Sequence, residues 1–318
     1  MKPPYKITSK ILSLIASISE KVGEVKTAYL NLPPAELRRE NRIKTIQSSL
    51  EIEGNTLSIE QVTALLDNKR VLAPQKEIQE VRNAINTYNQ LEQYKPYNIT
   101  SLCDAHQLLL FGLIDNPGEL RTTNVGIAKG DEIAHIAQPA HLIEKHLKSL
   151  LSYVKNDSDL LLIKSCVFHY EFEFIHPFLD GNGRMGRLWQ TVLLRQQYPA
   201  FEFLPIETLI KHKQQEYYST LAKCDSLGES TLFIEFMLTI INEALEDLLM
   251  SQPINITSED RIKLFQTIIK GAPFARKEYM RHFKDISNAT ASRDLREATE
   301  KGLLDKTGDG RNTVYRYK

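Results

Sequence analysis

Apolar residues recur at helical spacing along most of the chain, and breakers that contain proline divide them into segments. This pattern predicts helices over residues 7–30, 35–53, 59–69, 75–93, 99–113, 140–154, 158–175, 183–197, 206–224, 230–250, 258–270, 275–283 and 288–302. Residues 125–137, VGIAKGDEIAHIA, differ because short apolar runs flank Lys129-Gly130-Asp131, which predicts a small β-hairpin. Up to residue 250 the predicted fold class is therefore all-α with one hairpin.

Residues 258–318 follow a different pattern. Their predicted helices precede LLDKTGDGRNTVYRYK, which predicts two strands around a turn near Asp309-Gly310. Three helices followed by a β-ribbon are typical of a winged helix-turn-helix, with Arg293 and Arg296 on its recognition helix and Arg311 on its wing. The segment holds 14 Lys and Arg against 9 Asp and Glu, a net charge of +5. DNA binding therefore stays open beside dimerisation and protein docking.

Bulk composition narrows the class of protein. The 318 residues, 42% hydrophobic and 25% charged, are typical of a globular protein of about two domains. The formal net charge is zero, which gives no overall attraction to nucleic acid or membranes. No apolar run is long enough to span a membrane, and ILSLIASIS is spaced as an amphipathic helix rather than as a signal peptide. The three cysteines lie far apart without metal-binding spacing, so we expect a reduced, cytoplasmic protein: Cys103, Cys166 and Cys224.

The chemistry is concentrated in residues 176–187, HPFLDGNGRMGR. His176-Pro177 ends the preceding helix, because proline disfavours helical geometry in the residue before it. The glycines of Asp180-Gly181-Asn182-Gly183 let a ligand approach the backbone closely, and the free N–H groups of the next helix make an anion site. Arg184 and Arg187 are three positions apart and share a face of that helix. Two guanidinium groups above a glycine-lined loop suit a polyphosphate.

Two further side chains in this stretch suggest a reaction. A carboxylate beside phosphate oxygens commonly holds Mg²⁺, which makes Asp180 the predicted metal ligand. The imidazole of His176 is suited to take a proton from an attacking hydroxyl. His169, Glu173 and His176 also have the spacing of a metal-binding set, but HExxH is absent and further ligands are lacking. We therefore expect His169 and Glu173 to support the catalytic region, and we predict attack by a hydroxyl on a magnesium-bound nucleotide phosphate.

This stretch resembles the motif of the Fic family, HxFx(D/E)GN(G/K)RxxR. The matching positions are His176, Phe178, Asp180, Gly181, Asn182, Gly183, Arg184 and Arg187. The resemblance implies a Fic fold over about 35–225 and transfer of AMP from ATP, with Mg²⁺, to a Ser, Thr or Tyr hydroxyl of a target protein or of the chain itself. It implies that His176 is the base, that Asp180 holds the metal, and that Phe178 anchors the loop in the core. Residues 181–184 and Arg187 would then hold the phosphates.

A second stretch, Ser48 to Asn55, reads SSLEIEGN and resembles the inhibitory-helix pattern (S/T)xxxE(G/N) at Ser49, Glu53 and Gly54. Gly54 is expected to end the 35–53 helix. Glu53 then lies in the last turn, where a negative charge opposes the helix dipole and favours a cationic partner nearby. The resemblance implies that this partner is Arg187, that Glu53 takes the place of the ATP γ-phosphate, and that the chain inhibits itself.

The resemblance also divides the chain. It implies an N-terminal helical region with the inhibitory helix at 1–95 and a Fic catalytic domain at 96–250, which precede the winged helix predicted from the pattern at 258–318. The 125–137 hairpin would be the flap that registers a target strand, or else a plain surface hairpin. Tyr217 and Tyr218 would contact adenine, or else pack in the core. A homodimer, another nucleotide donor, AMP removal, and a DNA-binding regulator whose Fic body senses nucleotide all stay open.

Overall fold

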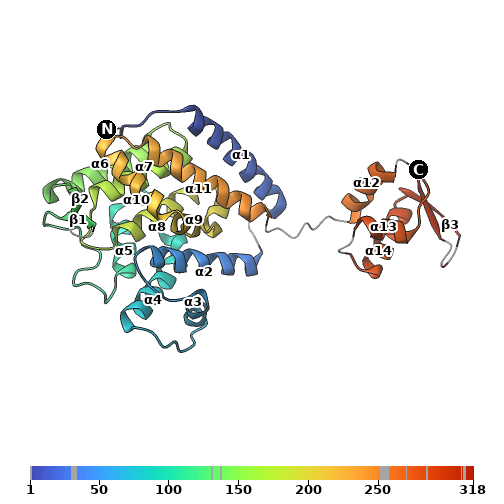
Figure 1. The fold of residues 1–318 in the computed structure, drawn as a ribbon, viewed down its shortest axis with the longest axis horizontal. Helices are drawn as coiled ribbons and strands as arrows, with labels where there is room; N and C mark the ends of the chain where they lie inside the picture. Colours follow the sequence, from blue (N-terminus) through green and yellow to red (C-terminus); the bar gives the residue numbers. More distant parts are fainter. Residues whose placement is uncertain are drawn as a thin grey trace. The chain divides into compact units, whose positions relative to one another are not determined.

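The structure is a computed structural model, and it describes residues 2–29, 34–129, 132–136, 138–250, 258–269, 271–283, 286–308, 310 and 313–318. Arg311, predicted on a wing, lies outside the described residues, as does the Gly130-Asp131 turn of the hairpin. The chain folds into two compact units, Met1–Ser251 and Gln252–Lys318, which are described separately below. Figure 1 colours both units along the sequence.

The first unit is helical, with one β-hairpin among its described residues, and so confirms the predicted fold class (Figure 1). Its elements are α1 (Ser9–Tyr29), α2 (Ala35–Ile52), α3 (Ile59–Leu66), α4 (Gln75–Asn89), α5 (Ile99–Leu109), β1 (Gly126–Lys129), β2 (Glu132–Ile136), α6 (Ile143–Asn156), α7 (Leu161–Ile175), α8 (Asn182–Leu194), α9 (Ile206–His212), α10 (Gln214–Leu227) and α11 (Thr231–Met250). Short 3₁₀ turns lie at Leu91–Gln93, Ala140–Leu142 and Pro199–Phe203. None of the helices within the described ranges is both long and apolar enough to cross a bilayer.

The predicted helix 206–224 is wrong in one respect, because the structure divides it into α9 and α10. Lys213 leaves helical geometry at φ −108° and ψ 28°, and its N–H donates to the carbonyls of Leu209 and Ile210 at 3.0 and 3.2 Å. No Gly or Pro marks this break in the sequence. Residues of α10 between Tyr217 and Asp225 line the cavity beside the motif loop.

Helices α7 and α8 form the centre of the first unit and pack against each other. α7 buries residues on all sides, from Leu162 to Ile175, which explains why its sequence is apolar around the whole helix. α6 and α11 cover α7, α1 lies along α11, and α2 packs against α9. The loop 176–181 joins the two central helices, so its backbone is fixed at both ends by the core.

The second unit contains α12 (Ser258–Ile269), α13 (Arg276–His282), α14 (Asn288–Glu300), β3 (Leu304–Thr307) and β4 (Val314–Tyr317). The two strands are antiparallel, and an isolated bridge pairs Phe274 with Tyr315. Ser287 caps α14 by accepting the N–H of Thr290 at 3.1 Å. The unit has its own core, made of Ile262, Phe265, Phe274, Tyr279, Ala291, Leu295, Ala298 and Leu304. This order of elements is the one that the sequence predicted.

Candidate functional site

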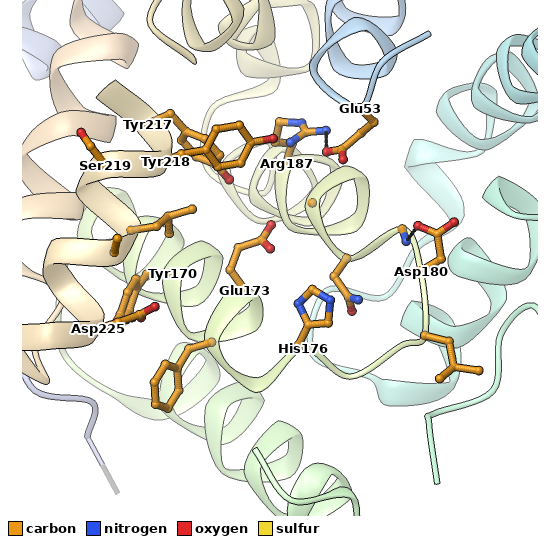
Figure 2. Close-up of a pocket in the computed structure, with 17 residues that line it drawn as sticks. Glu53, Tyr170, Glu173, His176, Asp180, Arg187, Tyr217, Tyr218, Ser219 and Asp225 are labelled. Carbon is orange, nitrogen blue, oxygen red and sulfur yellow. Dashed lines mark hydrogen bonds and ion pairs between the residues drawn. The ribbon is translucent and has the colours of Figure 1, made fainter. Parts of the chain in front are cut away.

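A cavity of about 480 Å³ opens beside the motif loop in the first unit. Its lining comes from the end of α2, from α7, from the loop and first turns of α8, and from α10 (Figure 2). One end is polar and contains His176, Asp180 and Arg187, whereas Phe174, Leu221 and Ala222 supply apolar surface. Ser219 and Asp225 of α10 also line it. A cavity of this size that combines apolar surface with polar groups is typical of a small-ligand site.

The loop at the polar end has two residues in the left-handed region. His176 follows α7 with φ 50° and ψ 64°, and Gly181 precedes α8 with φ 77°. The positive φ of Gly181 favours glycine, and a Cβ there would also come within 2.7 Å of the Leu110 side chain. These two reversals bring the end of α7 and the beginning of α8 to the same side of the cavity.

Phe178 anchors this loop. Its ring is fully buried and stacks on His106 of α5, with centroids 3.7 Å apart and planes 4° from parallel. The amide side chain of Asn182 accepts the N–H of Phe178 and donates to its carbonyl, each at 2.9 Å. The side chain of Asn182 therefore closes the loop.

His106 was not singled out by the sequence, although it holds the loop from the opposite side. Its Nδ1 accepts the N–H of Gly118 at 2.8 Å, and its Nε2 lies 3.0 Å from the carbonyl of Asp180. Burial lowers the pKa of His106 to about 4, so the ring is neutral and its Nε2–H donates to that carbonyl. A histidine at helical spacing on a buried face carries no sequence signal for this role.

Arg187 and Glu53 form the ion pair that the sequence analysis expected. Nη2 of Arg187 donates to Oε1 of Glu53 at 2.7 Å and to the carbonyl of Ser49 at 3.0 Å, and its Nε donates to Oγ of Ser49 at 3.2 Å. The Arg187 side chain is 1% exposed and that of Glu53 is 34% exposed. Burial alone would lower the pKa of Arg187, but Glu53, with smaller effects of Tyr217 and Glu173, keeps this pKa above its ordinary value.

Gly54 has the predicted place at the end of α2. It adopts φ 92°, its N–H donates to the carbonyl of Glu51, and the N–H of Asn55 donates to that of Leu50. These two bonds form a Schellman motif, which a residue with a Cβ would strain. The turn leaves Glu53 as the C-cap residue directly after the helix, with its carboxylate over the first turn of α8. A Cβ on Gly183 would lie 2.5 Å from Oε1 of Glu53, so the glycine makes room for that carboxylate.

Arg184 does not share the cavity with Arg187. It lies against Asp180, with Nη2 and Oδ1 separated by 3.4 Å, and it does not line the cavity. Side chains three positions apart on a helix diverge by about 60°, and here that difference separates the two guanidinium groups. The role of Arg184 as a nucleotide-binding residue stays a prediction, and of the two arginines only Arg187 lines the cavity.

Glu173 of α7 points into the cavity toward Arg187 (Figure 2). Burial raises its pKa to about 8 against the opposing effect of Arg187, so the carboxyl is mostly protonated at neutral pH. Its Oε1 is buried and has no hydrogen-bond partner in the described part of the chain. The sequence placed Glu173 next to the motif, but only the packing around α7 reveals its protonation.

His169 and Tyr217 link α7 to α10. Nδ1 of His169 lies 2.7 Å from Oε1 of Gln190, and its Nε2 lies 3.1 Å from the hydroxyl of Tyr217. Burial lowers the pKa of His169 to about 3, so the ring is neutral. Tyr217 is 1% exposed and packs mostly in the core, whereas Tyr218 is partly buried, and both line the cavity.

The residues at the polar end fit a magnesium ion that is held mainly by a substrate. No group of three or more His, Cys, Asp or Glu residues within the described ranges is arranged to hold a metal. Mg²⁺ in nucleotide sites commonly uses one or two carboxylates and takes its other ligands from phosphates and water. The Asp180 side chain is 58% exposed at the cavity, and the N–H of Gly181 fixes its Oδ1 at 2.6 Å. The same absence of a cluster gives no support to a zinc site at His169, Glu173 and His176.

Comparisons with known proteins agree with this fold and loop. The sequence model of the Fic/DOC family matches residues 96–194. The crystal structure of a Fic family protein from Desulfovibrio desulfuricans G20 is 41% identical and matches with a TM-score of 0.76, covering 100% of this chain and 98% of that one. The fold also matches Fic-1 from C. elegans at 21% identity and a TM-score of 0.62, covering 76% of this chain and 72% of that one. The chain belongs to the Fic family.

Curated relatives are more distant. Protein adenylyltransferase fic-1 from Caenorhabditis elegans is 28% identical over 216 residues, which cover 63% of this chain. Protein adenylyltransferase Fic from Drosophila grimshawi is 25% identical over 242 residues, which cover 73% of this chain. The match spans 40% of the nematode protein and 48% of the insect protein. Less than half of either relative therefore corresponds to this chain.

Proposed function

We propose that this chain transfers AMP from ATP to a Ser, Thr or Tyr hydroxyl of a protein. The observation that carries the proposal is the cavity in which the N-terminal turn of α8, the imidazole of His176 and the carboxylate of Asp180 lie together, with aromatic and aliphatic side chains of α7 and α10 elsewhere in its lining. Such a cavity suits a nucleotide, with its phosphate chain beside the polar residues and its nucleobase against the apolar side chains. The names of the curated relatives support the same activity.

The proposed reaction uses the chain's own groups in distinct roles. The first N–H groups of α8 and the positive end of its dipole bind the triphosphate. Asp180 holds the magnesium ion, which when bound neutralises part of the phosphate charge. His176 takes the proton of the acceptor hydroxyl while the oxygen of that hydroxyl bonds to the α-phosphorus. The bond from the α-phosphorus to the bridging oxygen breaks, and pyrophosphate leaves. General-base assistance of this kind contributes roughly 10²–10⁴ in rate.

The chain is also proposed to inhibit itself through Glu53. The carboxylate lies over the first turn of α8 and engages Arg187, so an internal anion takes a place suited to the γ-phosphate. A phosphate at that position would be repelled by the Glu53 carboxylate and could not bind the Arg187 guanidinium, which Glu53 already occupies. Departure of the α2 end would remove both obstacles, which predicts a low basal rate that rises when Glu53 is replaced.

Incubation with ATP labelled at the α-phosphate tests these roles together. The expected result is weak self-labelling of the parent, strong labelling of Glu53→Gly, and none of Glu53→Gly combined with His176→Ala. Mass spectrometry of the labelled chain would give the added group and the acceptor residue. No incorporation into any variant, or incorporation that survives His176→Ala, would contradict the proposal.

The nucleotide and the direction of transfer are tested separately. Unlabelled GTP and UTP should compete with ATP poorly, since the apolar end of the cavity is proposed to receive adenine beside Tyr218. Efficient competition by UTP or GTP would favour another nucleotide donor. Loss of AMP from a labelled chain after ATP is removed, dependent on His176, would favour AMP removal as the activity.

A second function is proposed for the second unit, namely DNA binding by a winged helix. A groove of about 540 Å³ lies between α13, α14 and β4, and three cationic side chains line it: Arg276, Lys277 and Arg281. Asn288 and Ser292 of α14 line the same groove and can donate to base edges. Arg296, expected on the recognition helix, lies 3.7 Å from Glu300 and is less suited to a phosphate contact.

Selection of duplexes from a random pool, followed by mobility shift, tests this second function. A bound duplex should lose affinity steeply with salt, and Arg276→Ala combined with Lys277→Ala should weaken binding and reduce the salt slope by about two. The matched control is Lys301→Ala, which removes a cation that pairs with Glu259 away from the groove. Absence of any selected duplex, or an equal effect of the control, would contradict DNA binding.

A further inference from the structure

Arg121 binds three consecutive carbonyl groups around the motif histidine. Its Nε donates to the carbonyl of His176 at 2.6 Å, its Nη2 donates to that of Ile175 at 3.2 Å, and its backbone N–H donates to that of Pro177 at 2.9 Å. Arg121 is 3% exposed. A single buried residue therefore fixes the chain immediately before, at and after the proposed base.

The same guanidinium also holds both ends of the hairpin segment. Nη1 donates to the carbonyl of Thr123 at 2.7 Å, and Nη2 donates to that of Gln138 at 2.5 Å. Thr123 precedes β1 and Gln138 follows β2. Among the described residues, all of its hydrogen-bond acceptors are carbonyl oxygens. Arg121 thus joins the base of the hairpin to the end of α7.

This arrangement explains an unusual backbone. A residue before proline favours extended geometry, and a residue with a Cβ rarely adopts positive φ, yet His176 has φ 50° and ψ 64°. The carbonyls at the end of a helix also lack partners within the helix and carry partial negative charge. A guanidinium fork can meet several such oxygens at once, because its five N–H groups point in fixed directions in one plane.

We propose that Arg121 is a positioning residue, which holds His176 in its left-handed conformation and in register with the hairpin where an acceptor segment would dock. The inference rests on the proposed transfer reaction for its effect on rate. Lysine cannot replace this arginine in that role, since a single ammonium group cannot reach the carbonyls of Ile175, His176 and Gln138 together. Arg121 does not line the cavity, so it acts through the histidine rather than on the nucleotide.

The test uses the full-length chain with Glu53→Gly as the parent. Arg121→Lys should lower the maximal rate of self-labelling by roughly 100-fold, as expected for a base misplaced by about 1 Å. The ATP concentration for half-maximal rate and the affinity for ATP should stay within about twofold of the parent. The matched control is Arg195→Lys, which alters a partly buried arginine that also binds a carbonyl, that of Leu91, and that lies just after the C-terminal end of α8, away from the loop. Arg195→Lys should label at the parent rate.

A second measurement does not depend on the reaction. In protein labelled with ¹⁵N-histidine, the ring signal of His176, assigned by its loss in His176→Gln, should shift or broaden in Arg121→Lys. The signal of His169 should stay unchanged. If Arg121→Lys folds poorly, the His176 ring signal is measured in Arg121→Gln instead, and the same change is expected.

The outcomes separate this inference from the proposed function. An unchanged His176 signal in both variants overturns the positioning role, whatever the rate. The positioning role is also overturned if Arg121→Lys labels itself at a rate within threefold of the parent. The same holds if Arg121→Lys and Arg195→Lys lose rate and ATP affinity equally. If the Glu53→Gly parent itself labels nothing, the proposed function fails, and the histidine signal still decides whether Arg121 positions His176.

Discussion

Replacement of Glu53 by glutamine tests the autoinhibitory contact at the level of binding, before any chemistry. Glutamine keeps the shape of the side chain and removes its charge, so α2 and its C-terminal turn should stay folded. The bond that changes is the 2.7 Å contact from Arg187, whose guanidinium is 1% exposed while the carboxylate is 34% exposed. We expect weaker occupation of the anion site on α8 and therefore tighter binding of ATP.

The magnitude follows from these exposures. A hydrogen bond between charged groups is worth about 1.5–3 kcal/mol, and the partial exposure of Glu53 reduces this to about 1–2 kcal/mol. If ATP binds only when the end of α2 has moved away, its apparent affinity rises in proportion to the fraction of open chains. A change of 1–2 kcal/mol then corresponds to roughly a 5- to 30-fold lower dissociation constant for ATP with Mg²⁺.

Isothermal titration calorimetry with ATP and with ADP measures this effect. Because Glu53 is proposed to take the place of the γ-phosphate, ADP affinity should change by less than about threefold, which gives an internal comparison. Glu51→Gln is the matched control, since Glu51 lies on the same helix, pairs with Lys211 at 3.5 Å and does not line the cavity. Equal gains for ATP and ADP, an ATP affinity unchanged in Glu53→Gln, or an equal gain in Glu51→Gln would refute this reasoning.

Three further predictions concern the stability and metal dependence of the site. Glu173 has a pKa raised to about 8 by burial, so its contribution to stability is full below the unfolded pKa near 4.5 and is lost as the pH rises through 8. Glu173→Gln should therefore raise the melting temperature progressively between about pH 5 and pH 8, and an increment independent of pH would contradict this. Phe178→Ala should lower the free energy of unfolding in urea by about 3–5 kcal/mol, because the ring is fully buried against His106, and Phe178→Leu should cost clearly less. Chelation of Mg²⁺ should weaken ATP binding to Glu53→Gly by about tenfold or more and should have no such effect once Asp180→Ala is added; equal sensitivity of both proteins would argue against Asp180 as the metal ligand.

The sequence by itself determined the local features of this protein. Gly54 ends α2 because only a residue without a Cβ readily adopts its φ of 92°, and its neighbours then complete the Schellman motif. The apolar period predicted most helices of the first unit, and Pro177 marked the end of α7 correctly. These features depend on residues within a turn or two of each other, whose spacing can be read directly. The expected pairing of Glu53 with Arg187, 134 positions apart, came from the resemblance and not from spacing.

Only the tertiary structure decided which side chains line or support the cavity and which of them are protonated. Helical spacing put Arg184 and Arg187 on one face of α8. In the folded chain, however, Arg184 contacts Asp180 and Arg187 pairs with Glu53. The protonation of Glu173 depends on burial, which no local pattern encodes. Arg121 donates hydrogen bonds to carbonyls at the end of α7 and on both sides of the hairpin. Every residue has a backbone carbonyl, so the sequence does not show which of them an arginine will bind. Contacts, burial and charge of this kind arise when distant segments meet, so they exist only in the folded chain.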